Sequence, residues 1–388
     1  MTFSINKSDW TKTKFGEVVM NTNETVKDPL QSGIQRFIGL DHMDSEQIRL
    51  SRFGNTSDGV TFTKRVKPGQ TLFGKRRSYQ RKVVFAEFEA VCSGDILAFS
   101  AKPELLDHLY LPFLVMSEGF FARALATSAG SLSPRTRWSD LAKFEFLLPS
   151  LVEQREIANL FWALEGQIAS IENLAHCFEQ TRASYLQHML NPLEIDAEWR
   201  ALQLDEVCTV VSGGTPSTLV KEYWDGDIPW VTPTDMTNTA EEFIDSSQRK
   251  ISQKGLESSG AKMIPANSLL ITSRASIGVA KINKIPISTN QGLQSLVPNE
   301  LTSVKFLKYW IEANQHALIR NSSGTTFPEI SNGKMKRLRI NLPPIEVQDS
   351  ITERMDQIID AIDDKKSELK KLIFLRNNLS QFFFEGTN

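Results

Sequence analysis

The segment PGQTLFGKRR, residues 68–77, nearly matches the phosphate-binding loop of nucleotide-binding enzymes. Gly69, four further residues, Gly74 and Lys75 fit the pattern G-x-x-x-x-G-K-[ST] up to its last position. There, Arg76 stands in place of the hydroxyl side chain that ligates magnesium in a true phosphate loop. The segment is therefore an altered ATP site, a loop that meets a different polyanion, or a chance match.

A second segment, NLPP at residues 341–344, is similar to the N-P-P-aromatic loop with which amino-methyltransferases hold a flipped base. In this chain Leu342 separates Asn341 from the prolines, and Ile345 replaces the aromatic residue. No glycine-rich cofactor loop is evident after a predicted strand. We interpret NLPP as a turn that closes a globular unit before a helix, and we expect no methyltransferase chemistry in this chain.

Metal chemistry is not expected either. Cys92, Cys177 and Cys208 lie far apart and form no C-x-x-C pair, and the five histidines are scattered. This pattern disfavours both a zinc site and a disulfide framework. We therefore expect the chain to bind no metal and no other cofactor of its own.

Size and composition are those of a globular protein. The chain has 388 residues, of which 40% are apolar and 23% charged, and its formal net charge is −2. This length allows two or three domains with full hydrophobic cores. No apolar run approaches the roughly 18 residues of a membrane span, and the N-terminus has no apolar signal-peptide core. We expect a cytoplasmic protein that does not contact a membrane.

Positive charge is concentrated in two acid-free runs. Residues 61–86 hold eight lysines and arginines and no acidic residue, and residues 334–339 read KMKRLR. Such runs occur on solvated surfaces as well as at polyanion-binding sites, so each is a candidate site only.

An internal repeat is the most informative feature of the sequence. Residues 130–157 and 324–351 align without a gap at an offset of 194, half the chain length, with six identities in 28 positions. Three of the six identities are Gly or Pro, which constrain the backbone, as expected for two copies of one fold. Phe15 and Leu204 begin similar segments, FGEVV and LDEVC, near the start of each half. The stretches between these anchors, rich in Gly, Pro, Thr and aromatic residues, predict strands and loops.

The repeat also explains the phosphate-loop match. At an offset of 197, PGQTLFGKRR corresponds to PANSLLITSR, residues 265–274, which lacks both glycines and the lysine. A phosphate loop needs glycines so that its backbone N–H groups can close around phosphate. The shared element is instead predicted to be a turn and an apolar strand with a basic tip. We expect this tip to contact a polyanion at the protein surface rather than to enclose a phosphate.

A long helix is predicted after each copy of the repeat. Apolar residues recur in alternating steps of four and three from Ile157 to Met189 and from Ile351 to Phe383. This 3.5-residue spacing is typical of a coiled-coil seam. A local two-fold between the copies would pair the helices antiparallel, with one globular unit at each end of a rod. The sequence also permits a parallel pair with both units at one end.

Further apolar residues lie off this seam and need a second cover. Either the globular units bury them or helices of a partner protein do, and we favour the partner. The candidate partner-docking residues are Leu160, Leu174, Leu186, Leu190, Ile373, Phe374, Phe382 and Phe384.

These patterns together predict an α+β chain in four parts. Two tandem mixed α/β domains, at residues 1–150 and 192–343, are separated by two long antiparallel coiled-coil helices. The helices are expected at residues 151–191 and 344–388, with an internal pseudo-two-fold between the halves.

Several segments resemble the specificity subunit of type I restriction-modification systems. They are VSGGTPSTLVKEYWDGDIPWVTPTDM and GTTFPEISNGKMKRLRINLPPIEVQ with its following helix, and LFGKRR in the first half. The resemblance covers nearly the whole chain, including the order variable half, helix, variable half, helix. It is looser in the first half, where GSLSPRTRWSDL departs from the usual G-T-x-x-x-x-I form and Trp138 replaces a small polar residue.

The resemblance implies two target-recognition domains, each of which reads one half of a bipartite target in double-stranded DNA. The helices would be a spacer and docking sites for two methyltransferase subunits, and restriction subunits would join that core to form an ATP-dependent nuclease. S-adenosylmethionine, ATP and magnesium would belong to those partners. The specificity subunit itself would perform no chemistry.

The residues agree with binding to DNA. Duplex DNA carries one charge per about 1.7 Å, so basic loops supply sequence-independent affinity, and polar side chains read base edges in the grooves. The candidate phosphate contacts are Lys75, Arg76, Arg77, Arg81 and Lys82 in the first half and Lys221, Arg274, Lys334 and Lys336 in the second. The candidate base-reading residues are Ser131, Ser133, Arg135, Thr215, Ser217, Thr325 and Thr326, each of which could equally serve in an ordinary turn.

Two alternatives stay open. A stand-alone, two-headed DNA-binding regulator would have the same two domains, but it would not need uncovered apolar helix faces. The partner could also be a fused nuclease-methyltransferase rather than separate subunits. Co-purification with methyltransferase subunits separates the regulator from the specificity subunit.

Overall fold

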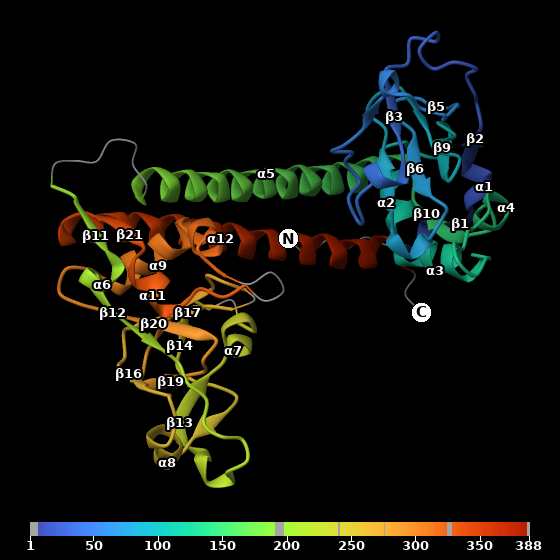
Figure 1. Ribbon diagram of the computed structural model, residues 1–388. Helices are drawn as coiled ribbons and strands as arrows, with labels where there is room; N and C mark the ends of the chain where they lie inside the picture. The colour runs from blue at the N-terminus through green and yellow to red at the C-terminus, as the bar shows by residue number, and fades with distance from the viewer. Residues whose placement is uncertain (1–6, 191–197, 240, 275, 324–327, 386–388) are drawn as a thin grey trace. The chain divides into compact units, whose positions relative to one another are not determined.

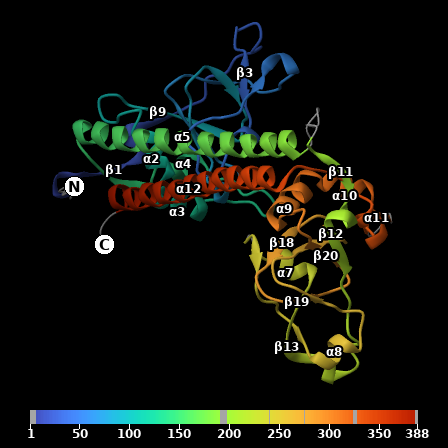
Figure 2. The same cartoon turned by 90° about the vertical axis from the view of Figure 1, so that its left-hand side faces the viewer.

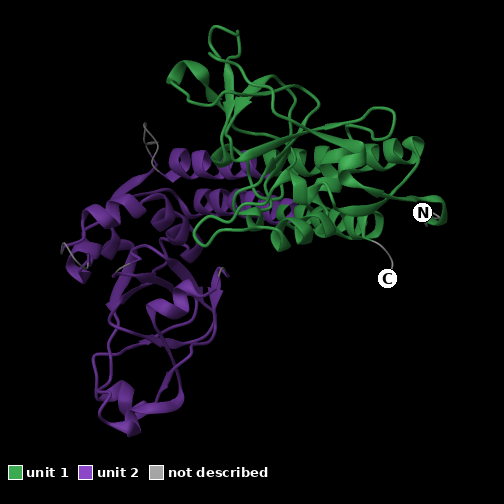
Figure 3. Cartoon of the chain, turned by 90° about the vertical axis from the view of Figure 1, so that its right-hand side faces the viewer, with its two compact units in different colours: residues 1–173, 366–388 green, residues 174–365 purple. Residues whose placement is uncertain are grey.

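The computed structural model describes residues 7–190, 198–239, 241–274, 276–323 and 328–385. The chain forms two compact units, which Figure 3 draws in green and purple. Unit 1 comprises residues 1–173 and 366–388, and unit 2 comprises residues 174–365. Each unit therefore contains half of both long helices, whereas the sequence suggested that the helices are separate parts.

Unit 1 is built on three small sheets. Their strand orders are β1-β10, β2-β9-β6-β7 and β4-β3-β8-β5. The strands are β1 (Thr11–Lys14), β2 (Val19–Thr22), β3 (Arg36–Ile38), β4 (Gly54–Asn55), β5 (Lys64–Val66), β6 (Thr71–Gly74), β7 (Val83–Phe85), β8 (Ala90–Cys92), β9 (Ile96–Ala101) and β10 (Glu145–Leu148). The helices are α1 (Phe15–Val18), α2 (Leu111–Met116), α3 (Glu118–Ala126) and α4 (Trp138–Leu141), with 3-10 turns η1 (Lys7–Asp9), η2 (Leu40–His42), η3 (Thr56–Asp58) and η4 (Ser78–Gln80).

Unit 2 repeats this plan with one added strand. Its sheets have the orders β11-β21, β12-β20-β17-β18-β14 and β15-β13-β19-β16. The strands are β11 (Arg200–Gln203), β12 (Cys208–Ser212), β13 (Trp224–Val231), β14 (Phe243–Ile244), β15 (Lys250–Ile251), β16 (Met263–Ile264), β17 (Leu269–Thr272), β18 (Ala280–Asn283), β19 (Ile287–Thr289), β20 (Leu293–Pro298) and β21 (Arg339–Leu342). The helices are α6 (Leu204–Val207), α7 (Pro233–Thr237), α8 (Gln253–Glu257), α9 (Val304–Ala313), α10 (Gln315–Arg320) and α11 (Asn332–Lys336), with the 3-10 turn η5 (Lys221–Tyr223).

The two units share strand pairing as well as strand order, which confirms the duplication. β1 pairs antiparallel with β10, as β11 does with β21, and the parallel pair β3-β8 recurs as β13-β19. The short anchors predicted from FGEVV and LDEVC are the helices α1 and α6. In each, a glutamate three residues in, Glu17 or Glu206, accepts a hydrogen bond from the backbone N–H just before the helix.

The two long helices are α5 (Leu151–Leu190) and α12 (Ile345–Phe384), each 40 residues long. Figures 1 and 2 show them side by side. In unit 1 the first half of α5 packs on the last half of α12, with the rings of Phe161 and Phe383 6.0 Å apart. In unit 2 the opposite halves meet, where Leu190 and Met355 share a core. The helices are therefore antiparallel, and the predicted apolar seam is the surface that joins them.

One glutamine near the start of each long helix fixes that helix to its unit. Gln154 donates from Nε2 to the carbonyl oxygens of Leu105 and Pro149, at 3.1 and 2.9 Å, and its Oε1 accepts the Asp107 N–H at 2.8 Å. The equivalent Gln348 makes the same three types of contact at the start of α12. Both glutamines are completely buried.

We expect Gln154→Leu to lower the free energy of unfolding by about 2 kcal/mol, because the partly buried Asp107 N–H and two carbonyl groups would lose their partner. Urea denaturation followed by tryptophan fluorescence measures this loss. The control is Gln180→Leu, which changes an exposed glutamine of the same helix and should leave stability nearly unchanged. Equal stabilities for the two variants would contradict the assigned role of Gln154.

Candidate nucleic-acid interface

The segment that resembles a phosphate loop has a different structure. Residues 71–74 are strand β6, all four buried, and only the 3-10 turn η4 follows. A phosphate loop instead leads into a helix whose N-terminal N–H groups face the phosphates. The interpretation of this segment as a turn, an apolar strand and a basic tip is confirmed.

The equivalence of this segment with its second copy needs a correction of one residue. The left-handed turn residues are Gly69, with φ of +84°, and Asn267, with φ of +59°, so the offset is 198 rather than 197. The misplacement arose because the sequence alignment matched two prolines, whereas the backbone repeats the turn. Arg76 is therefore the counterpart of Arg274.

At the end of β6 in unit 1, four side chains form what we call the tip cluster: Arg76, Asp95, Ser133 and Arg135. Arg135 holds Asp95 through Nε and Nη2, at 2.7 and 3.1 Å. Arg76 Nη1 lies 3.6 Å from Asp95 Oδ2, and its Nη2 donates to Ser133 Oγ at 3.1 Å. The hydrogen bond from Arg135 is the main reason that the pKa of Asp95 is below its usual value.

In unit 2 an ion pair occupies the same position. Arg274 Nε lies 2.9 Å from Glu329 Oε1. The backbone also pairs alike in the two units, because Arg76 bridges Arg135 as Arg274 bridges Glu329. Thr325 and Thr326, two of the predicted base-reading residues, lie outside the described residues.

The remaining basic candidates differ in their exposure and in their hydrogen-bond partners within the chain. Lys82 Nζ donates to the Leu40 carbonyl at 2.6 Å, and Lys334 Nζ donates to Ser323 Oγ at 2.6 Å. Lys221 is exposed in the turn η5. The half-buried candidates are Lys75, Arg77 and Lys336.

The polar candidates of unit 2 lie in a loop that is held tightly to its sheet. A Cβ on Gly213 would lie 2.0 Å from the Asn290 carbonyl oxygen, so only glycine permits this approach. Thr215 Oγ1 accepts a hydrogen bond from Asn290 Nδ2 at 3.1 Å. Ser217 makes turn contacts, since its Oγ accepts the Leu219 N–H at 3.4 Å. In unit 1, Ser131 is exposed beside the tip cluster.

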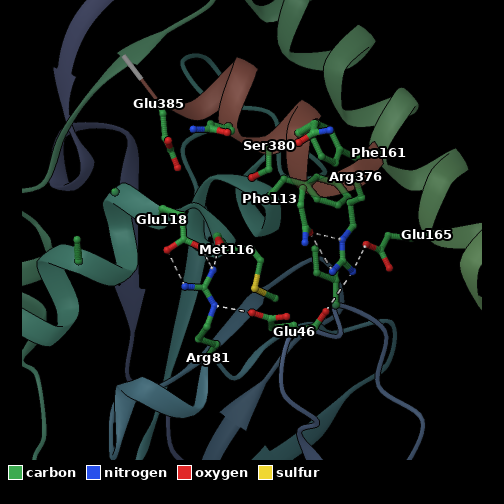
Figure 4. Close-up of a pocket in the computed structure, with 16 residues that line it drawn as sticks. Glu46, Arg81, Phe113, Met116, Glu118, Phe161, Glu165, Arg376, Ser380 and Glu385 are labelled. Atoms are coloured by element: carbon green, nitrogen blue, oxygen red, sulfur yellow. Dashed lines mark hydrogen bonds and ion pairs between the residues drawn. The ribbon is translucent and has the colours of Figure 1, made fainter. Parts of the chain in front are cut away.

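Arg81 differs from the other candidates because it lines a cavity of about 600 Å³ in unit 1 (Figure 4). Its guanidinium lies 2.9 Å from a Glu46 oxygen and 2.8 Å from a Glu118 oxygen. It also lies over the ring of Phe121, 4.5 Å from the ring centre. These internal partners already balance the charge of Arg81.

Arg376 enters the same cavity from α12 (Figure 4). It pairs with Glu165 of α5 at 3.2 Å, and the two side chains are only 15% and 7% exposed. Burial raises the pKa of Glu165, and the charge of Arg376 opposes that rise. The pair therefore joins the two long helices inside unit 1.

The predicted docking residues divide into buried and exposed groups. Leu186 and Leu190 are 7% and 1% exposed and belong to the core of unit 2, so their assignment as docking residues was wrong. Leu160 and Phe384 pack partly against the core of unit 1. The globular units thus cover much of the second apolar face. The docking candidates outside both cores are Leu174, Phe374 and Phe382, which are exposed, and Ile373, which is half-buried.

The motif NLPP lies in strand β21 and the following turn rather than in an open base-binding loop. Ala201 pairs with Asn341 between β11 and β21, and the Pro343 carbonyl accepts Gln348 Nε2 at 2.9 Å. Within the described ranges, no group of three His, Cys, Asp or Glu side chains is placed to hold a metal ion. No described helix is both long and apolar enough to cross a bilayer.

Comparison with known proteins matches residues 196–373 to the type I restriction modification DNA specificity domain. The MjaIX type I restriction enzyme specificity subunit of Methanocaldococcus jannaschii is 34% identical over 177 residues, 45% of this chain and 41% of that protein. The EcoR124I/EcoR124II specificity subunit of Escherichia coli is 29% identical over 244 residues, 60% of this chain and 58% of that protein. Through residues 196–373, this chain is similar to the specificity subunits of type I restriction enzymes. The matches span about half the length of these relatives.

Two solved structures share the fold of this chain over nearly its whole length. The type I S subunit of M. genitalium matches with a TM-score of 0.61 and 17% identity, over 100% of this chain and 98% of its own. The HsdS subunit of Thermoanaerobacter tengcongensis matches with a TM-score of 0.53 and 18% identity, over 98% and 97%. The first half, which lies outside the matched family domain, therefore has the same fold.

We expect Arg376→Met to lower the free energy of unfolding by about 3 kcal/mol at pH 7, because Glu165 would be left buried and unpaired. Without Arg376, the folded-state pKa of Glu165 lies further above its unfolded-state value. The folded variant then binds the Glu165 proton more tightly than the unfolded chain does. The loss of stability caused by Arg376→Met should therefore shrink as the pH falls through the folded-state pKa of Glu165. Urea denaturation at pH 7 and at about pH 5 tests this dependence.

The matched control for this variant is the double variant Glu165→Gln, Arg376→Met. It has no carboxylate at this position, so its loss of stability relative to the wild type should not show the same decrease at acid pH. An equal loss for the single variant at both pH values would contradict the pairing of Arg376 with an ionised Glu165.

Proposed function

We propose that this chain is the non-catalytic specificity subunit of a type I restriction-modification complex. Each unit reads one part of a bipartite target in double-stranded DNA. The duplication of the fold carries this proposal, because two units with the same sheets and different loop residues suit two half-sites with different sequences. The match of residues 196–373 to the type I specificity domain and the basic side chains at the strand ends support it.

Recognition of DNA in this proposal combines two kinds of contact. Lys75, Lys221 and Lys336 supply charge for the phosphate backbone, which gives affinity without sequence preference. The arginines and hydroxyl residues at the tips reach base edges, which give the sequence preference. Arg81 is not part of this surface in our proposal, because Glu46 and Glu118 hold it inside the cavity.

The chemistry belongs to partners in this proposal. Two methyltransferase subunits would bind S-adenosylmethionine and dock on the long helices, and restriction subunits would bring ATP and magnesium. Exposed apolar side chains on α12 support a docked partner: Phe374 is 68%, Leu375 45% and Phe382 43% exposed.

The long helices would set the gap between the two half-sites. Inserting four residues after Glu172 and four after its repeat equivalent Lys366 lengthens both helices by about 6 Å, roughly two base pairs. We expect the mutant, expressed with its methyltransferase, to methylate the same half-sites with a longer unspecified spacer. Genome-wide mapping of methylated bases measures this.

The control inserts the same four residues after Gly59, in an exposed loop of unit 1. Its spacer should stay at the wild-type length. A helix insertion that keeps the original spacer, or a target that is not split, would contradict the proposal.

The docking surface is tested by Phe374→Glu. A charge at this exposed apolar position should weaken binding of the methyltransferase subunit at least tenfold, because the carboxylate would be buried without a partner. Co-purification and light scattering measure assembly. Leu219→Glu is the control, since Leu219 is 91% exposed in the proposed DNA-binding loop and should not affect assembly. Equal assembly by both variants would contradict docking at Phe374.

A further inference from the structure

The tip clusters of the two units have the same backbone frame but different charges. The Lys75 N–H donates to the Asp95 carbonyl at 3.0 Å, and the Ser273 N–H donates to the Gly292 carbonyl at 2.8 Å. These hydrogen bonds make Gly292 the counterpart of Asp95 in unit 2. The carboxylate has therefore moved between the copies, from Asp95 in unit 1 to Glu329, the counterpart of Arg135, in unit 2.

Asp95 lies beneath two more exposed arginines. Its side chain is 21% exposed, whereas those of Arg76 and Arg135 are 39% and 46% exposed. Both Asp95 oxygens are engaged by Arg135, through Nε and Nη2. The guanidinium of Arg135 is thus fixed in its plane along one edge, and its Nη1 also donates to the Ser133 carbonyl oxygen at 3.4 Å. Each of Nη1 and Nη2 keeps a second N–H for a base, because each terminal nitrogen carries two.

A guanidinium held in this way is suited to guanine. Arginine recognises guanine through two parallel hydrogen bonds to O6 and N7, which is the commonest base-specific contact in the major groove. A free arginine side chain loses rotamer entropy when it is ordered on a base. A carboxylate that orders the side chain before binding lowers this cost and favours a planar, two-bond contact over a single phosphate contact.

We propose that Asp95 is a positioning residue for DNA specificity: it presents Arg135, together with Arg76, to guanine in the half-site that unit 1 reads. This inference rests on the proposed function in DNA recognition. Asp95 itself touches no base. Unit 2 has one arginine at this place, Arg274, held by Glu329, so the two units present different donor sets on one frame.

The test is Asp95→Asn in the complex with the methyltransferase subunits. Dissociation constants are measured for the cognate duplex, a duplex with the first half-site scrambled, and a duplex with the second half-site scrambled, at several salt concentrations. We expect discrimination against a scrambled unit 1 half-site to fall about tenfold or more. Affinity for the scrambled duplexes should rise, because two arginines lose their internal counter-charge. For the same reason, the slope of log K against log[salt] should become steeper by up to about 0.9.

Two controls show whether the effect is local. Discrimination at the half-site read by unit 2 should be unchanged, which also shows that the variant complex is folded. Glu145→Gln removes a carboxylate that pairs with Lys12 at 2.7 Å elsewhere in unit 1, and it should change neither discrimination nor the salt slope.

The outcomes separate this inference from the proposed function. If Asp95→Asn weakens binding to all duplexes by one common factor, or if the unit 1 half-site contains no guanine, the positioning role is wrong while DNA recognition stands. If the wild-type complex prefers no duplex sequence at all, the proposed function fails and this inference fails with it.

Discussion

The apolar seam between α5 and α12 is the constraint on which the rest of the structure depends. Each globular unit completes its core with half of one helix and the opposite half of the other, as at Phe161 and Phe383 in unit 1 and at Leu190 and Met355 in unit 2. Neither core can close on one helix alone. The antiparallel direction follows, because two copies of one fold require equivalent helix ends.

Duplication explains why one backbone frame carries two different sets of side chains at its strand ends. Gln154 and Gln348 fix the helix starts through the same backbone contacts, and the short sheets repeat their pairing. The side chains at the strand ends do not repeat: Asp95 and Arg135 are matched by Gly292 and Glu329. A frame held by buried backbone contacts tolerates such changes, since the tip residues contribute little to the core.

Much of this architecture could be predicted from the sequence. The 3.5-residue pattern placed both helices to within a few residues, because burial of one helix face leaves a periodic signal. The candidate site could be predicted less well from the sequence. The carboxylate partners of Arg76, Arg81 and Arg376 come from other segments of the chain, which no local sequence pattern connects. The wrong docking assignment of Leu186 and Leu190 has a similar cause, since helix periodicity shows an apolar face but not which neighbour covers it.

The most direct test of the central claim is the methylation target of a hybrid chain. Residues 15–148 would be replaced by the equivalent first domain of a family member with a different target, with both long helices kept. Mapping of methylated bases in cells that express the hybrid with the methyltransferase should show one changed half-site, with the other half-site and the spacer retained. A target in which both half-sites change together would contradict two independent readers on one duplicated frame.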